Sequence, residues 1–96
     1  MTRHMALLSF TEQGIKNVQD SGKRAASFQA AVEAAGGKVV SQYWASGRYD
    51  GCVIFDAPNE ETAATLLLGL GQKGNVRTQT LRLFGEQEFA SLVGNL

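Results

Sequence analysis

The side chains best suited to chemistry lie in the short stretch SGRYDG, Ser46–Gly51, which places Arg48, Tyr49 and Asp50 between two glycines. Glycine permits a positive φ or a close backbone approach, and aspartate in a turn accepts hydrogen bonds from backbone amides. Asp50 therefore has two interpretations. Either it braces the turn, or it faces Arg48 or Arg77 in a charge-assisted pair that orients a polar ligand or a partner chain.

The other reactive side chains favour structural roles. His4 is the only histidine and has no orienting partner nearby in the sequence, and Cys52 leads into an apolar strand, where a small buried hydrophobe is typical. One histidine and one cysteine are too few for an ordinary zinc site. The G-x-G of LLLGLGQKG closes a helix instead of opening one. The sequence therefore predicts neither a metal nor a cofactor.

The apolar pattern predicts the elements that position these side chains. Strands are expected at residues 4–10, 38–46, 52–57 and 76–84. Helices are expected at residues 20–35, from the Asn59 cap to the KGN stretch at 73–75, and from about residue 86, with a short helical turn within residues 11–19.

This order predicts an α+β, ferredoxin-like βαββαβ fold with a C-terminal helix. Right-handed crossovers then place both main helices on one face of a four-stranded antiparallel sheet of order 4-1-3-2. In that topology residues 10–14, 46–51 and 73–78 meet at one end of the sheet, here named the rim. The predicted ligand-binding residues at and beside the rim are Thr11, Gln13, Tyr43, Trp44, Tyr49, Asp50, Arg77 and Thr78.

The expected chemistry of the rim is mixed. The helix N-terminus that follows Phe10 and the guanidinium of Arg77 favour a ligand with an anionic or strongly accepting head. Leu and Val side chains behind them suit an apolar tail. An unpaired Asp50 carboxylate would oppose an anion, so the sequence leaves the charge preference open.

Four stretches carry a family resemblance over nearly the whole chain: FTEQGIKNVQDSGKR, AAGGKVVSQYWASGRYDGCVIFDAPNEETAA, KGNVRTQTLRLF and the acidic GEQEF. Together they resemble the GYD domain family of small bacterial proteins, with Gly47, Tyr49 and Asp50 at the naming motif and Arg48 in its variable place. Gly22 stands where the more usual family pattern, DSPxR, has proline, which weakens the correspondence between Arg24 and the arginine of that pattern. The resemblance implies a single GYD-like domain over residues 1–96, similar to dimeric α/β barrels in which two sheets pack face to face. It implies no settled biochemical activity.

The adjacent Tyr43 and Trp44 indicate a partner. Strand alternation sends them to opposite faces, so one aromatic looks away from the helices. The apolar face to which it belongs is most simply covered by a second copy of the chain. We therefore expect a homodimer or higher oligomer that packs as a dimeric α/β barrel.

Composition excludes several other partners. Nine basic and nine acidic residues cancel, so no positive field attracts nucleic acid or an anionic membrane. No apolar run has membrane-spanning length and the N-terminus does not resemble a secretory signal. A single cysteine fits a reducing cytoplasm.

Three classes of function remain open. The first is a homo-oligomeric module that binds a small, partly apolar molecule between helices and sheet. The second is a cofactor-independent monooxygenase- or isomerase-like enzyme, which rests on fold analogy and lacks a clear base. The third is a structural or adaptor oligomer without a ligand.

Overall fold

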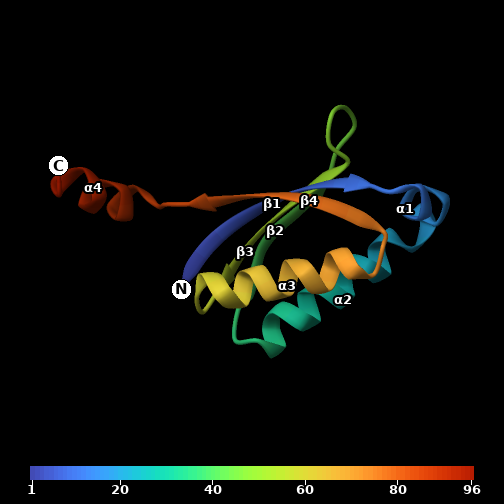
Figure 1. The fold of residues 1–96 in the computed structure, drawn as a ribbon, viewed down its shortest axis with the longest axis horizontal. Coiled ribbons are helices and arrows are strands. Elements are labelled where there is room, and N and C mark those ends of the chain that lie inside the picture. Colours follow the sequence, from blue (N-terminus) through green and yellow to red (C-terminus); the bar gives the residue numbers. More distant parts are fainter.

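The computed structural model describes residues 1–96 and contains one four-stranded antiparallel sheet with four helices. The strands are β1 (Thr2–Phe10), β2 (Lys38–Trp44), β3 (Gly51–Ala57) and β4 (Val76–Leu83), and the helices are α1 (Glu12–Lys16), α2 (Ser21–Ala34), α3 (Glu60–Gln72) and α4 (Glu86–Gly94). A 3₁₀ turn at Val18–Asp20 joins α1 to α2. The strand order is β2-β3-β1-β4, with α2 and α3 on the same side of the sheet (Figure 1). This is the ferredoxin-like arrangement predicted from the sequence.

Buried and less buried residues alternate along β1 and β3, and the buried ones form the core on the helix side of the sheet. In β1 the buried residues are His4, Ala6 and Leu8, and β3 buries every second residue from Gly51 to Ala57. The other buried residues are Gly14 of α1, Phe28 and Val32 of α2, Ala63 of α3 and Val76 of β4. The 3.6-residue helical period and the two-residue strand period therefore converge on a single apolar layer.

Two of the helices, α1 and α3, begin at the side-chain caps predicted from the sequence. The side chain of Asn59 accepts a hydrogen bond from the Thr62 backbone N–H at 2.8 Å, and Glu60 and Glu61 occupy the first turn of α3. Thr11 caps α1 by accepting from the Gly14 N–H at 3.1 Å. These bonds satisfy N–H groups that have no partner within the helix. None of the helices combines the length and the apolar character needed to cross a bilayer.

Tyr43 and Trp44 face opposite sides of the sheet, as alternation predicts. Trp44 lies opposite Gly51, whose strand buries the same face against the helices, whereas Tyr43 lies opposite Cys52 on the face without helices. Tyr43 is 60% exposed there. The away-facing aromatic is therefore Tyr43.

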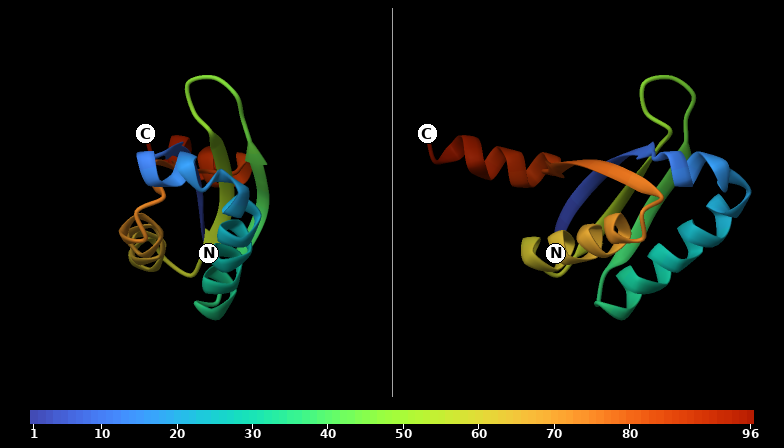
Figure 2. Two further views of the ribbon diagram at one scale, coloured as in Figure 1. Left: turned by 90° about the vertical axis from the view of Figure 1, so that its right-hand side faces the viewer. Right: turned by 45° about the vertical axis from the view of Figure 1, so that its right-hand side comes forward.

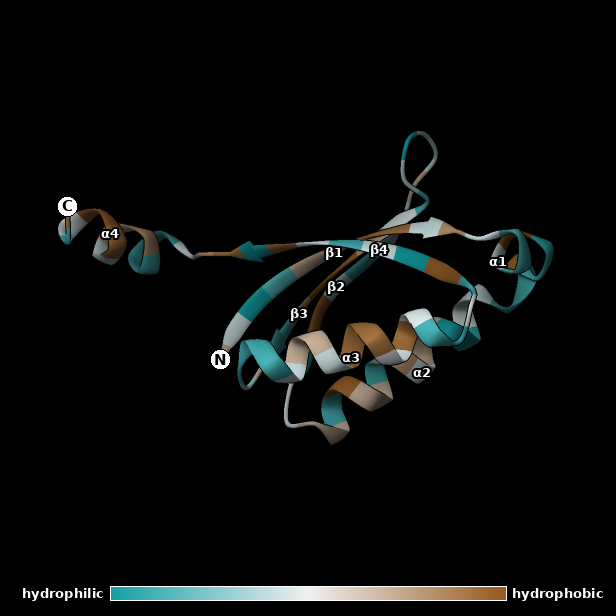
Figure 3. Ribbon diagram, viewed as in Figure 1, coloured by the Kyte–Doolittle hydropathy of each residue, from teal (hydrophilic) through white to brown (hydrophobic).

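The last helix, α4, stands apart from the rest of the molecule. It continues the direction of β4 and projects away from the sheet and from α2 and α3 (Figures 1 and 2). The radius of gyration is 14.2 Å, against about 12.5 Å for a compact chain of this length. Phe89, Leu92 and Val93 remain about half exposed, and apolar colouring runs along this helix in Figure 3.

Candidate functional site

The rim forms because polar side chains of residues 10–14 bind the backbone of the loop before β4. The Thr11 hydroxyl donates to the Gly74 carbonyl oxygen at 2.6 Å, and its backbone N–H donates to the Asn75 carbonyl oxygen at 3.1 Å. The Gln13 side-chain amide donates to the Lys73 carbonyl at 3.0 Å and to Asn75 Oδ1 at 2.9 Å. Two of the three rim segments are therefore held together by these bonds.

Asp50 ties the third rim segment to the end of β1. Its Oδ2 accepts a hydrogen bond from the Phe10 backbone N–H at 2.8 Å, and its own N–H donates to the Leu8 carbonyl at 2.8 Å. The expectation that turn amides are its donors is wrong, because the donor belongs to β1. No ion pair joins Asp50 to Arg48 or Arg77. The carboxylate is a brace between distant segments, and its second oxygen is without a hydrogen-bond partner.

The β2–β3 loop directs Tyr49 toward the face without helices. Gly47 has φ +134°, a conformation that residues with a Cβ rarely adopt. The Tyr49 hydroxyl donates to Gln79 Oε1 at 2.8 Å, and the Arg48 guanidinium lies 5.8 Å from the centre of the Tyr49 ring. Tyr49 therefore links the loop to β4 across the end of the sheet.

A cavity lies on the helix side of the rim, between α2 and the ends of the strands. It is here named the rim cavity. Its thirteen lining residues are Leu8, Phe10, Ser21, Arg24, Ala25, Phe28, Gln42, Trp44, Asp50, Val53, Leu70, Asn75 and Val76. Eight of them are hydrophobic, and the cavity volume is about 40 Å³. Because a buried water needs roughly 10–15 Å³, this space holds about three waters or a small chemical group.

Two of the predicted site residues, Trp44 and Asp50, line the rim cavity. Thr11 and Gln13 do not, since their polar groups hold the rim segments together. The remaining four predicted residues lie elsewhere. Tyr43 and Tyr49 belong to the helix-free face and the loop above it, and Arg77 and Thr78 line a wider hollow between α3 and β4. The eight residues therefore do not surround one concavity.

The sequence interpretation missed the part of the cavity that α2 provides. Arg24 donates to the carbonyl oxygens of Asn17 at 2.9 Å and Gly14 at 3.3 Å, and to Ser21 Oγ at 3.2 Å. Phe28 supplies the apolar floor and packs edge-on against Phe55. Arg24 and Phe28 lie one turn apart on the core side of a predicted helix, and this spacing could have identified them as cavity residues. Gln42 could likewise have been found, because strand alternation places it on the same face as Trp44.

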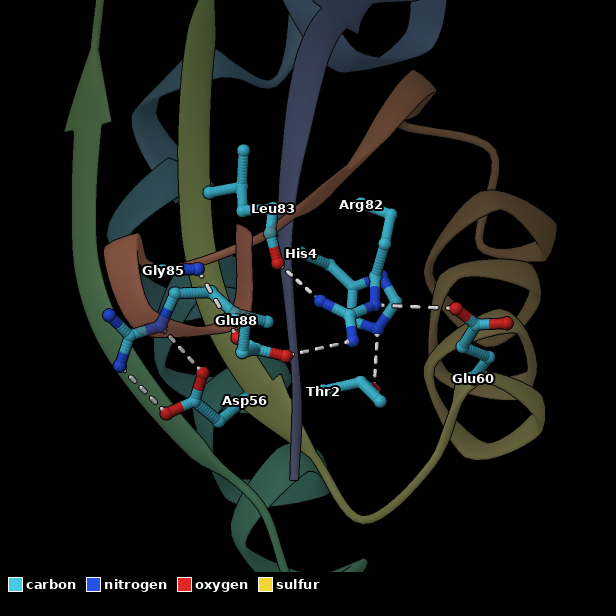
Figure 4. Close-up of polar contacts among 9 residues, drawn as sticks. Thr2, His4, Asp56, Glu60, Arg82, Leu83, Gly85 and Glu88 are labelled. Atoms are coloured by element: carbon cyan, nitrogen blue, oxygen red, sulfur yellow. Dashed lines mark hydrogen bonds and ion pairs between the residues drawn. The ribbon is translucent and has the colours of Figure 1, made fainter. Parts of the chain in front are cut away.

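The opposite end of the sheet is a network of mutually paired polar groups (Figure 4). His4 is 5% exposed, stacks on Phe55 and shares a 2.8 Å hydrogen bond with the Thr2 hydroxyl. Burial, followed by the positive charge of Arg82, lowers the pKa of His4 below its usual value. The imidazole of His4 is therefore held in place by a ring on one side and a hydroxyl on the other.

Two arginines complete this network. Arg82 binds Glu60 at 3.3 Å, Glu88 at 3.4 Å and the Leu83 carbonyl. Arg3 makes two hydrogen bonds to Asp56, at 2.8 and 3.0 Å, and they lower the pKa of that carboxyl. Each acid near these arginines has a cationic partner, in contrast to Asp50 at the rim.

Comparison with known proteins agrees with this fold. The GYD domain family model matches residues 4–93. A search of curated proteins finds no match.

Among solved structures, the chain is similar to the feast or famine regulatory protein Rv3291c from M. tuberculosis, which was solved with L-methionine. The identity is 14% and the TM-score is 0.68, and the match covers 88% of this chain and 51% of that one. It is also similar to TTHA0845 from Thermus thermophilus, at 21% identity and a TM-score of 0.56, covering 88% and 95%. The chain thus spans about half the length of the regulatory protein.

Proposed function

We propose that this chain, which belongs to the GYD domain family, is a homo-oligomeric protein that binds a small, partly apolar molecule in the rim cavity. The observation that carries the proposal is the cavity itself, which combines an apolar lining with a few polar groups at its edge. Sites of this composition are typical for small ligands. L-methionine in the structure of the feast or famine regulatory protein supports a small-molecule ligand for a domain of this shape.

The dimensions of the cavity favour a ligand that enters only in part. About 40 Å³ accommodates a short apolar group, while Trp44, 53% exposed, borders it from β2. The rest of the ligand would lie at the mouth beside Asp50. Thr11 and Gln13 would act indirectly, by holding Asn75 and Val76 in the cavity wall.

Two of the other predicted site residues, Tyr43 and Tyr49, fit a role in assembly. Tyr43 lies among Leu7, Cys52 and Ile54 on the sheet face that no helix covers. Exposed Leu81 extends this apolar surface onto β4. Contiguous apolar surface of this kind marks interaction sites, and the symmetric occupant of such a face is a second copy of the chain. Tyr43 and Tyr49 are therefore proposed as contacts between subunits.

Native mass spectrometry of the protein purified from its own host tests both parts of the proposal. We expect the mass of at least a dimer, plus an excess mass that disappears on denaturation. Ala25→Leu should abolish the excess mass, because Ala25 lines the cavity and a larger side chain would fill it. Ala26→Leu is the matched control, because Ala26 is the next residue in the chain, is exposed and does not line the cavity. A bare mass in the unmodified protein, together with no thermal stabilisation by any small molecule in the host extract, would contradict ligand binding.

A further inference from the structure

We propose that the rim cavity selects zwitterionic molecules that carry an apolar side chain, the α-amino acids with apolar side chains being the simplest class. This inference rests on the proposed function, because it names the ligand class of the same cavity. It follows from two residues of opposite charge, Arg24 and Asp50, that line the cavity and form no ion pair.

The negative charge is Asp50, which comes from the sheet side. Its Oδ2 is occupied by the Phe10 N–H, whereas Oδ1 accepts no hydrogen bond within the chain. A neutral backbone donor leaves the charge of the carboxylate uncompensated. The free oxygen is therefore available to an ammonium group of a ligand.

The positive charge is Arg24, which comes from α2. Three of its five N–H groups donate to Asn17, Gly14 and Ser21, and all three acceptors are uncharged. The other two N–H groups have no acceptor within the chain, and we assign them to a ligand carboxylate. The three bonds hold the guanidinium in place, so little side-chain freedom remains to be lost on binding.

Neither charge is neutralised within the protein. The ion pairs of the chain lie elsewhere: Arg3 with Asp56, Lys16 with Glu12, and Arg82 with Glu60 and Glu88. Arg24 and Asp50 also lie more than 4.0 Å from each other, since they form no ion pair. A ligand with a single charge would satisfy one of them and be repelled by the other, whereas a zwitterion satisfies both.

The remaining wall suits the rest of such a molecule. Phe28, Leu70 and Val53 form the apolar interior. The Gln42 side chain, which has no hydrogen bond within the chain, adds a polar group beside Trp44. A short aliphatic side chain would occupy the interior, with the charged atoms between Arg24 and Asp50.

Isothermal titration calorimetry of the ligand-free oligomer with four probes tests the selectivity. L-leucine carries both charges and an apolar side chain, 3-methylbutylamine lacks the carboxylate, 4-methylpentanoate lacks the ammonium, and glycine lacks the side chain. We expect L-leucine to bind roughly ten- to hundredfold more tightly than each of the others, because each omission removes one charged hydrogen bond or the apolar contact.

Two charge-neutralising variants test whether Asp50 and Arg24 cause the preference for L-leucine. Asp50→Asn retains an acceptor for the Phe10 N–H, so we expect it to fold and to bind L-leucine no better than 4-methylpentanoate. Arg24→Gln should bind L-leucine no better than 3-methylbutylamine. Glu33→Gln and Lys23→Gln are matched controls on exposed positions of α2 and should retain the preference of the unmodified protein. If Arg24→Gln does not fold, Arg24→Lys, which keeps the charge but not the planar fork, should weaken L-leucine and 4-methylpentanoate alike.

The outcomes separate this inference from the proposed function. Equal binding of L-leucine and either singly charged probe overturns zwitterion selectivity. A preference for L-leucine over the singly charged probes that is retained in both Asp50→Asn and Arg24→Gln also overturns this selectivity. Failure of all four probes, while native protein still carries an excess mass that Ala25→Leu abolishes, overturns the ligand class but leaves the binding function intact. A bare mass of the unmodified protein as well, together with no thermal stabilisation by any small molecule in the host extract, overturns both.

Discussion

The Asp50 carboxylate and the Phe10 backbone N–H form a 2.8 Å hydrogen bond that joins the β2–β3 loop to the end of β1. The Asp50 N–H donates back to Leu8, so the two segments are connected in both directions. This relationship closes one end of the sheet, where Asp50 forms part of the wall of the rim cavity.

Replacing Asp50 should reveal the contribution of this bond to stability. Asp50→Ala leaves the half-buried Phe10 N–H without its acceptor, which costs about 1–3 kcal/mol. For a domain of this size, thermal unfolding monitored by circular dichroism should shift downward by about 4–8 °C per kcal/mol. Asp50→Asn should lose less, because its amide oxygen still accepts. Equal melting temperatures for Asp50→Ala and the unmodified protein would show that the bond contributes nothing.

Two glycines in helices allow the effect of close packing on stability to be distinguished from the effect of helix propensity. A Cβ on Gly14 would lie 1.9 Å from the Asn75 carbonyl oxygen, whereas one on Gly69 in α3 would meet open space. Gly14→Ala should therefore lower the melting temperature by roughly 5–20 °C. Gly69→Ala should raise stability by about 1 kcal/mol, because alanine favours the helix. Similar shifts for both variants would contradict the close approach of α1 to the loop before β4.

His4 should make stability depend on pH in mildly acidic solution. Its pKa in the folded protein is lowered, while the unfolded chain has a pKa of about 6.5. As the pH falls below about 6.5, the unfolded state binds a proton that the folded state does not, so stability decreases until the folded pKa is passed. Urea unfolding between pH 7.5 and 5 should show this decrease, and His4→Gln should remove most of it. The lowered pKa of Asp56 acts in the same direction, but only below about pH 4. A slope that is unchanged in His4→Gln would assign the effect to other groups.

The helix-free face should determine the oligomeric state. Tyr43→Glu would bury an unpaired carboxylate in the proposed interface, at a cost of several kcal/mol, so the oligomer should dissociate to monomers in sedimentation experiments at micromolar concentration. Ile15→Glu is the matched control, because Ile15 is an exposed apolar residue of α1, away from the sheet. A monomer in the unmodified protein, or an oligomer that survives Tyr43→Glu, would contradict the proposed interface.

Much of the fold follows from the sequence alone, because it depends on local periodicity. The alternation in β3 and the Phe28–Val32 spacing in α2 are visible as residue patterns, and both faces are buried as those patterns predict. Asn59 caps α3 through a side chain that reaches only three residues ahead. Connectivity then restricts the strand order to the one observed, since right-handed crossovers leave few alternatives.

Tertiary structure alone decided which partners the rim residues have. The β-bulge between Val39 and Ser41 shifts the pairing of β2 with β3, so the face of Trp44 depends on an irregularity that no local pattern marks. Asp50 could bind a turn amide, an arginine or a distant amide, and only the register of β1 against β3 presents the Phe10 N–H to it. The rim cavity draws its wall from six elements and the loops between them, so Arg24 and Asp50 meet in one site through packing between segments far apart in the chain. Periodicity specifies which face a residue occupies, whereas the contacts across that face depend on long-range register and packing.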